Sequence, residues 1–252
     1  MQRKVFINLV AVTFSLVALT YLSACSSSDA EKIAEEILPS TMVRAIHLSP
    51  DAPEVDVDYE LVEVEATIAG LQYKEASPYT EVSSGTAKVT FKLSSDGQEI
   101  GSIEAPGFAS DIDNTVYAVN MAANVEFLQS EDDRLRDDDN AKVRFVHAVH
   151  DAPSVDVKTD TPAGTAVFPS VAFKDITDYN HVAPGIYTFV VTQAGDTENA
   201  VVTFEPVTLE AGTIYTVVAL GTLDDGDDYD FGVRVYVDSG DGNTFVDLTI
   251  AQ

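Results

Sequence analysis

VRAIHLSPDAPEVDV, residues Val43–Val57, is nearly copied one hundred positions later as VRFVHAVHDAPSVDV, residues Val143–Val157. Nine of the fifteen positions are identical. The same register continues beyond this motif, because Tyr79 recurs as Tyr179. A repeat at this distance predicts two similar domains of about one hundred residues each rather than one large domain.

Short strands dominate the pattern within each copy. Thr86–Leu93 alternates polar and apolar residues, while Ile186–Val191 and Tyr215–Leu220 are rich in β-branched and aromatic residues. Clusters of Gly, Pro, Asn and Asp separate such runs. We therefore predict an all-β fold with two tandem immunoglobulin-like antiparallel β-sandwich domains, over residues 42–135 and 136–252. Small β-barrels are the alternative.

The N-terminus has the pattern of a secretory signal. Arg3 and Lys4 precede the apolar run Val5–Leu22, and small residues follow. The tetrapeptide LSAC, which ends at Cys25, resembles a bacterial lipobox. That resemblance implies that residues 1–25 are a lipoprotein signal peptide and that Cys25 is lipidated. The alternative is an uncleaved membrane-spanning helix, for which the apolar run is almost long enough.

The residues after Cys25 suggest how and where the protein is anchored. The polar stretch 26–41 is predicted to be a tether that holds the folded part away from the bilayer. In lipoproteins of this type an Asp after the cysteine indicates the inner membrane, whereas this chain has Ser26. The resemblance therefore implies an exported protein anchored to the cell envelope, at the outer membrane where the host has one.

Composition excludes several classes of function. The 252 residues include 42 acidic and 14 basic side chains, which give a formal charge of -28. Such a chain repels phosphate backbones, so we expect no nucleic-acid partner. Solubility explains the acidity, and cation binding by carboxylates is the alternative. Because Cys25 is the only cysteine, its acylation leaves no thiol for a disulfide, a zinc site or a nucleophile.

The motif residues resemble a known family. VRAIHLSPDAPEVDV, the segments YTEVSSG and YNHVAPG, and TIYTVVALG are similar to the bacterial extracytoplasmic module called domain of unknown function 4397. The resemblance covers both repeats, although the second has Val149-His150 where the first has Ser49-Pro50. It implies a β-sandwich in secreted or anchored proteins, and it implies no reaction.

The repeated histidine has a structural interpretation and a functional one. In an extended strand His47 shares the apolar face of Val43, and His147 lies in the equivalent position. We predict that each ring is partly buried at a strand end and bonds a carbonyl or carboxylate of the following turn. The alternative is a metal site with Asp51 or Asp151, although one His with one or two Asp falls short of a usual zinc set.

The other charged residues of the motif are also expected to be structural. Asp51 and its counterpart precede an Ala-Pro pair, where the carboxylate can accept backbone N–H groups in an Asx-turn. Arg44 is the basic residue of the first copy, and we predict that it pairs with Asp56. Arg144 is correspondingly predicted to pair with Asp156.

A hydrolase built on Ser49, His47 and Asp51 is disfavoured. The second copy has Val149 at the serine position, and the chain contains no G-x-S-x-G elbow. Neighbours in sequence also rarely form a triad, because the fold normally assembles its members from separate segments.

Two acidic loops near the C-terminus, Asp224–Asp230 and Asp238–Asp247, are candidates for calcium binding. Phe231–Ile250 is predicted to be a hairpin with its turn at SGDGN. Loops rich in Asp and Gly are typical of calcium sites, yet neither loop fits the EF-hand pattern, and solvated turns explain both. The carboxylates concerned are Asp224, Asp225, Asp227, Asp228, Asp238, Asp241 and Asp247.

Three functions follow from these observations. The first is a lipid-anchored, non-enzymatic envelope protein whose duplicated β-sandwiches form a binding or structural module without a cofactor. Its partners would be the membrane, through the anchor, and other envelope proteins or glycans. The second is calcium-dependent adhesion or assembly. The third is an envelope hydrolase that uses a motif histidine.

Overall fold

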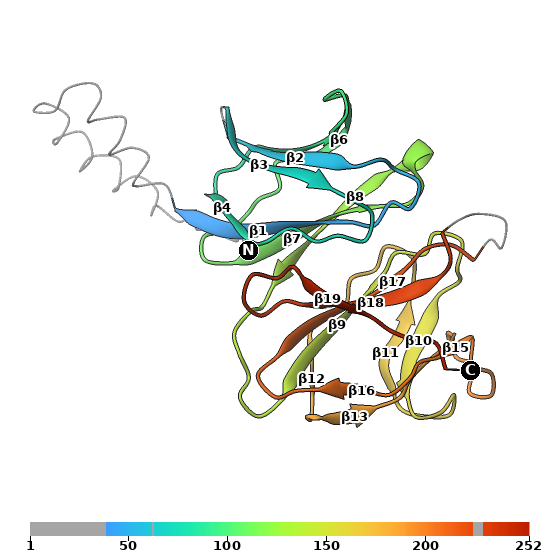
Figure 1. Cartoon of the computed structure of the whole chain (residues 1–252). Coiled ribbons are helices and arrows are strands. Elements are labelled where there is room, and N and C mark those ends of the chain that lie inside the picture. Colours follow the sequence, from blue (N-terminus) through green and yellow to red (C-terminus); the bar gives the residue numbers. More distant parts are fainter. Residues whose placement is uncertain (1–38, 62, 224–228, 252) are drawn as a thin grey trace, which may run out of the picture. The chain divides into compact units, whose positions relative to one another are not determined.

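The computed structural model describes residues 39–61, 63–223 and 229–251 (Figure 1). The chain divides into two units, Met1–Pro39 and Ser40–Gln252, and the second unit contains both repeats. The predicted signal peptide, Cys25 and the tether up to residue 38 lie outside the described residues. In the part that is described, no helix has the length and apolar character needed to cross a membrane.

The first repeat forms two four-stranded sheets. One sheet has the order β4-β1-β7-β8, with β1 at Ser40–His47, β4 at Thr80–Ser83, β7 at Asp113–Val119 and β8 at Glu126–Asp132. The other has the order β3-β2-β5-β6, with β2 at Val55–Glu60, β3 at Val64–Leu71, β5 at Lys88–Leu93 and β6 at Glu99–Glu104. A single 3₁₀ turn, η1 at Ala122–Asn124, lies between β7 and β8.

The second repeat has the same plan, with one added strand in its first sheet and an additional two-stranded ribbon. Its first sheet has the order β12-β9-β17-β18-β19, with β9 at Ala141–His147, β12 at Asn180–Val182, β17 at Ile214–Leu220, β18 at Gly232–Val237 and β19 at Thr244–Asp247. Its second sheet has the order β11-β10-β14-β15, with β10 at Val155–Thr159, β11 at Ala166–Val171, β14 at Phe189–Gln193 and β15 at Val202–Thr203. A separate ribbon pairs β13, Gly185–Tyr187, with β16, Val207–Leu209.

The all-β prediction is confirmed, and no sheet of the described residues closes into a barrel. The C-terminal hairpin is also confirmed, as β18 and β19. The expectation of purely antiparallel sheets is wrong at one place in each repeat, because β1 pairs with β7, and β9 with β17, in parallel. A parallel pair needs a long crossover, and here the chain passes through the second sheet between the two partners.

The repeated motif carries the chain from one sheet of each sandwich to the other. It contains the end of β1, a proline-containing turn and the start of β2, and likewise β9 and β10 in the second repeat. Val43 and Ala45 of β1 pack in one core cluster with Val55 and Val57 of β2. Val143, Phe145, Val155 and Val157 lie in the equivalent cluster of the second repeat.

A third core cluster joins the two repeats. Ile46 and Tyr117 come from the first repeat, while Val146, Val218 and Tyr236 come from the second. Strands β1 and β9 are therefore buried on both faces, one toward their own sandwich and one toward the other repeat. We call this shared contact the seam. Burial of each such large side chain contributes about 1.5–3 kcal/mol, so the repeats share part of their stability.

The predicted limits of the repeats need one adjustment. Residues 40 and 41, which were expected to belong to the tether, are the first two residues of β1. The predicted limit between the domains, at residues 135 and 136, lies in the eight-residue connection 133–140 between β8 and β9.

Candidate functional site

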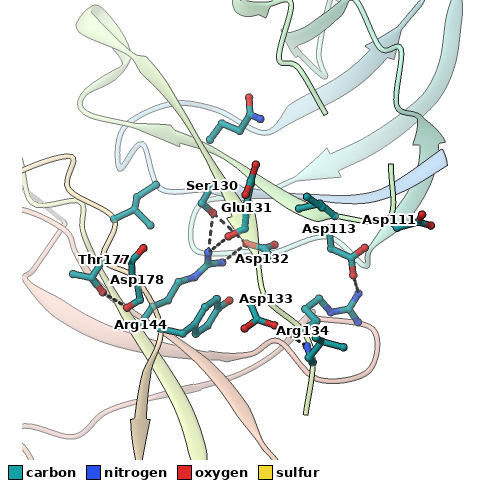
Figure 2. Close-up of a pocket in the computed structure, with 15 residues that line it drawn as sticks. Asp111, Asp113, Ser130, Glu131, Asp132, Asp133, Arg134, Arg144, Thr177 and Asp178 are labelled. Atoms are coloured by element: carbon teal, nitrogen blue, oxygen red, sulfur yellow. Dashed lines mark hydrogen bonds and ion pairs between the residues drawn. The ribbon is translucent and has the colours of Figure 1, made fainter. Parts of the chain in front are cut away.

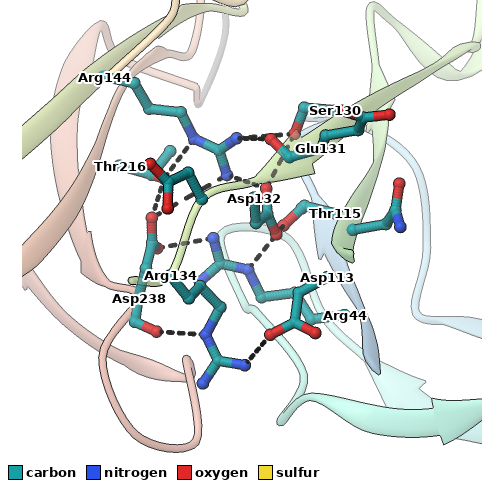
Figure 3. Close-up of polar contacts among 12 residues, drawn as sticks. Arg44, Asp113, Thr115, Ser130, Glu131, Asp132, Arg134, Arg144, Thr216 and Asp238 are labelled. Atoms are coloured by element: carbon teal, nitrogen blue, oxygen red, sulfur yellow. Dashed lines mark hydrogen bonds and ion pairs between the residues drawn. The ribbon is translucent and has the colours of Figure 1, made fainter. Parts of the chain in front are cut away.

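Two pairs of opposite charges are buried at the seam. Arg44 Nη2 lies 2.6 Å from Asp238 Oδ1, and Arg144 Nη2 lies 2.6 Å from Asp132 Oδ1 (Figure 3). These four side chains are at most 1% exposed. They are close ion pairs rather than well-aligned hydrogen bonds. Each arginine pairs with a carboxylate of the other repeat, so the pairs cross the seam.

Each carboxylate also accepts hydrogen bonds from a threonine and a tyrosine of its own repeat. Asp132 Oδ2 accepts the hydroxyls of Thr115 and Tyr79, the latter at 2.7 Å. Asp238 Oδ2 accepts the equivalent hydroxyls of Thr216 and Tyr179.

The same threonines also orient the arginines. Arg44 Nε donates to Thr115 Oγ1 at 3.0 Å, and Arg144 Nε donates to Thr216 Oγ1 at 2.8 Å. The cluster therefore contains the same four kinds of residue twice, related by exchange of the repeats. We refer to these eight residues as the seam network.

Asp132 and Arg44 of the seam network keep their charges at neutral pH. Burial alone would raise the pKa of Asp132, but Arg144 and Arg44 outweigh that effect and hold the pKa below its usual value. Burial likewise opposes the charge on Arg44, yet Asp238 and the neighbouring groups raise its pKa overall. Burial raises the pKa of Tyr79, so this phenol keeps its proton and donates a hydrogen bond to Asp132.

The predicted clasps Arg44–Asp56 and Arg144–Asp156 are wrong. Asp56 accepts the N–H of Gly70 at 2.8 Å and the hydroxyl of Ser94 at 2.6 Å, and both bonds lower its pKa. The neighbours of both Arg44 and Asp56 point into the sandwich core. Because alternate residues of a strand face opposite ways, Arg44 and Asp56 project from opposite outer faces of the sandwich.

Asp156 of the second repeat repeats this arrangement. It accepts the N–H of Ser170 at 2.7 Å and that of Gly195 at 3.0 Å. The two aspartates therefore secure edges of their own sheets and do not reach the arginines of the motif.

The motif histidines are more deeply buried than predicted. His47 Nε2 lies 3.1 Å from the carbonyl oxygen of Pro53, and His47 Nδ1 accepts the N–H of Ser49 at 3.3 Å. Since Nδ1 is an acceptor, Nε2 carries the hydrogen and donates it to the Pro53 carbonyl. His147 makes the same two contacts, with Pro153 and with the N–H of Val149. The ring binds the backbone of residue 49 or 149, so serine and valine serve equally well there.

Asp51 does not contact His47, so the structure does not assemble Ser49, His47 and Asp51 as a triad. Its carboxylate accepts the N–H of Ala122 at 2.6 Å, and that of Asp151 accepts the N–H of Leu223. The expectation of a local Asx-turn is thus wrong. The carboxylate turns away from its own turn and secures the segment that follows β7 or β17.

The calcium candidates fall into two groups. Asp224, Asp225, Asp227 and Asp228 lie outside the described residues. In the other loop Asp238 belongs to the seam network, while Asp247 forms a two-point contact with Arg234 at 2.6 and 2.7 Å. Asp241 is exposed. Within the described part of the chain, no three His, Cys, Asp or Glu side chains are grouped so that they could hold a metal ion.

A cleft of about 920 Å³ opens beside the seam network (Figure 2). One wall is the second half of β8 with the residues that follow it to Leu135, and the other is the segment Ile176–Tyr179 of the second repeat. Arg144 and Asp132 also line it. We call this space the seam cleft.

Acidic side chains surround the seam cleft. Asp111, Glu131 and Asp178 are exposed at its rim. Asp113 and Asp133 are also there, but Arg134 Nη1 binds Asp113 at 2.6 Å and Lys142 Nζ binds Asp133 at 2.6 Å. The cleft therefore presents an excess of negative charge to solvent, above a floor whose charges are already paired.

Sequence reasoning missed the carboxylates of the seam network. It placed the limit between the domains at residues 135 and 136, within the charged run SEDDRLRDDD of residues 130–139, although Asp132 is buried in that run, and it assigned Asp238 to the calcium candidates. One signal was available: Thr115, Tyr79 and Arg44 each recur in the second repeat, and polar residues that recur together predict a shared buried network. The partner of each arginine was hidden because it belongs to the other repeat.

Comparison with known proteins identifies one family. The profile described as "Domain of unknown function (DUF4397)" matches residues 41–158 and again residues 141–245. The first match covers the first repeat and runs into the motif of the second, the second match covers most of the second repeat, and together they extend over most of the described chain. A comparison with curated proteins found no match.

Loss of one carboxylate of the seam network should destabilise the fold strongly. We expect Asp132→Ala to lower the free energy of unfolding by about 3–5 kcal/mol, because Arg144 would remain buried without its partner. Urea unfolding measures this change. As a control, Arg136→Ala removes an ion pair whose side chains are 69% and 84% exposed, and it should cost less than about 1 kcal/mol. Similar small effects for both variants would contradict a stabilising network.

The buried histidines should make stability depend on pH. Burial lowers the pKa of His47 and His147, so the unfolded chain binds protons more readily than the folded chain. Stability should be constant above about pH 7 and fall as the pH drops below about 6.5, by up to about 1.4 kcal/mol per pH unit for each histidine. Melting temperatures between pH 8 and 5 check this. The double variant His47→Gln/His147→Gln should show a shallower slope, and an unchanged slope would refute the assignment.

Proposed function

Because the chain belongs to the DUF4397 family, whose name states no activity, we propose a function from its own residues: a lipid-anchored envelope protein that binds a partner and catalyses no reaction. The observation that carries this proposal is the seam cleft. It is large enough for a segment of a partner, and the shared core at the seam supports both of its walls. Other envelope proteins are the favoured partners, ahead of glycans and of calcium-dependent assembly.

Binding suits the seam cleft better than catalysis does. A general acid or base must exchange its proton near neutral pH, whereas the pKa of Asp132 is lowered and that of Tyr179 is raised. The Tyr179 hydroxyl donates a hydrogen bond to Asp238, and Arg144 forms an ion pair with Asp132. The groups at the floor are thus held in fixed ionisation states, which supports recognition of a ligand rather than its conversion.

The anchor rests on the sequence. LSAC at residues 22–25 follows an apolar run with a basic start, and a polar stretch separates Cys25 from β1. An acylated Cys25 would place the folded part near a membrane surface, and Ser26 favours the outer membrane. Attachment through a short tether also raises the local concentration of the module relative to other envelope proteins.

Lipidation of Cys25 can be tested in the producing cells. We expect the wild-type chain to incorporate labelled palmitate and its precursor to accumulate under globomycin. Cys25→Ala should abolish the label, because acylation requires that thiol, whereas Ser28→Ala should retain it. Equal labelling of the wild type and of Cys25→Ala would contradict the anchor.

Partner binding at the seam cleft can be tested by photo-crosslinking in the same cells. We expect a photoreactive residue at Glu131, on the rim, to give a discrete higher-mass adduct, because a bound partner would lie within reach. The control position is Gln98, which is exposed on the turn between β5 and β6. Absence of an adduct at both Glu131 and Asp178, or equal adducts at Gln98, would argue against the cleft as the binding site.

A further inference from the structure

The two halves of the seam differ in one respect. The turn between β18 and β19 reaches across to the first repeat, where the carbonyl of Asp241 accepts the N–H of Tyr79 at 2.9 Å. The carbonyl of the next residue, Gly242, accepts Arg44 Nη1 at 2.7 Å. Tyr79 is only 8% exposed beneath this turn.

The equivalent place beside Tyr179 and Arg144 is the seam cleft. Both residues line it, and Tyr179 is more exposed than Tyr79. Among the described residues, the N–H of Tyr179 has no hydrogen-bond acceptor comparable to Asp241. The first repeat has no hairpin to place there, because the chain runs from β8 through residues 133–140 directly into β9.

Strand β8 correspondingly lacks the neighbour that β18 has. It is the last strand of its sheet, whereas β18 is covered by β19. Asp132 and Asp238 occupy equivalent places in the seam network, so Glu131 corresponds to Val237. The N–H of Asp238 points inward to β17, and the carbonyl of Val233 points outward to Leu248. Successive residues of a strand point their backbone N–H and C=O groups alternately to the two sides, so those of Val237 point away from β17. By this correspondence the N–H and C=O groups of Glu131 point to the open edge of β8.

One contact of Glu131 supports this direction. Its carbonyl oxygen accepts Arg144 Nη1 at 3.3 Å, a bond that can form only on the side away from β7. Arg144 Nη1 also donates to the hydroxyl of Ser130 at 2.8 Å. The N–H groups along this edge have no strand partner within the described residues.

We propose that the seam cleft binds an extended basic peptide segment of a partner protein, which adds to β8 as β19 adds to β18. A carbonyl of this peptide accepts the N–H of Tyr179, in the way that Asp241 serves Tyr79. The inference rests on the proposed function and specifies its ligand class and binding mode. Strand addition of this kind obtains affinity from the backbone and specificity from the flanking side chains.

Charge selects the occupant. The exposed rim carries Asp111, Glu131 and Asp178, so lysine or arginine side chains on the peptide are favoured. Residues 26–38 of this chain carry four acidic residues and one lysine, which makes them a poor occupant. A second copy of the chain, with its charge of -28, is disfavoured for the same reason.

The half of the seam that is covered by the turn between β18 and β19 also predicts a glycine in the peptide. A Cβ atom on Gly242 would lie 2.3 Å from the ring of Tyr79, and the φ of this residue is +77°. A segment that approaches Tyr179 in the same way needs glycine at the residue after the carbonyl that accepts the N–H.

A peptide that copies the turn and β19, without β18, gives the most direct test. It has the sequence of residues 239–247 with Asp241→Lys and Asp247→Lys, carries a fluorophore and is titrated with the full-length chain in detergent. We expect saturable binding by fluorescence anisotropy. The unsubstituted peptide, and the lysine peptide with the further change Gly242→Val, should each bind at least tenfold more weakly.

Two variants at one position isolate the edge of β8. Glu131→Pro removes the outward N–H, whereas Glu131→Val keeps it, and both remove the same carboxylate. Binding of the lysine peptide should be at least tenfold weaker for Glu131→Pro than for Glu131→Val, with thermal unfolding confirming that both are folded. Hydrogen exchange at the amide of Tyr179 should slow when the peptide is added.

Each other outcome overturns the proposal. Equal affinities of the two Glu131 variants, or no detectable binding, would exclude strand addition at this edge. Dimers in sedimentation that Glu131→Pro dissolves would identify a second copy as the occupant. If the peptide fails while photo-crosslinking at Glu131 still captures a partner, the binding function stands and only the ligand class is wrong.

Discussion

The crossed ion pairs of the seam are the constraint on which the rest of the structure depends. Arg44 and Asp132 belong to one repeat, and each finds its counter-charge in the other. Burial of an unpaired charge would cost several kcal/mol, so neither repeat can bury this face alone. The requirement keeps β1 and β9 covered on both sides and fixes the walls of the seam cleft. The position of the cleft therefore follows from how the buried charges are paired.

The four buried charges at the seam are better explained by their effect on how the two repeats align than by a net gain in stability. A buried ion pair often contributes no more than a hydrophobic contact of the same size, because both ions lose their hydration. Mispairing is more costly, since a sliding of one repeat past the other would separate Arg144 from Asp132. The apolar residues around the network supply the attraction, while the network selects one arrangement of the two sheets.

The sequence predicted what is local to each repeat. Alternating apolar residues and the DAP turn were sufficient to predict the strands, the C-terminal hairpin and the inward direction of His47. The parallel pairing of β1 with β7 was out of reach, because strand alternation carries no information on which distant strand lies alongside. The Arg44–Asp56 expectation failed for a similar reason, since a residue close in sequence was preferred to a partner in the other repeat. A backbone-binding role was foreseen in kind for Asp51, which binds Ala122 rather than its own turn, whereas the backbone-binding role of Asp56 was not foreseen. Asp132 lies in a run of charged residues, whose composition predicts exposure to solvent. Only the folded structure distinguishes it from neighbours such as Asp138, which stays exposed.

The exchange symmetry of the seam network has an evolutionary consequence. Arginine pairs with aspartate in one direction and aspartate with arginine in the other, which is the rule for an isologous interface around a two-fold axis. Two separate copies of a single repeat would satisfy the same contacts as a homodimer. Gene duplication and fusion would then have enclosed an existing dimer in one chain. Once the halves were covalently joined, the second was free to acquire β19 without the first.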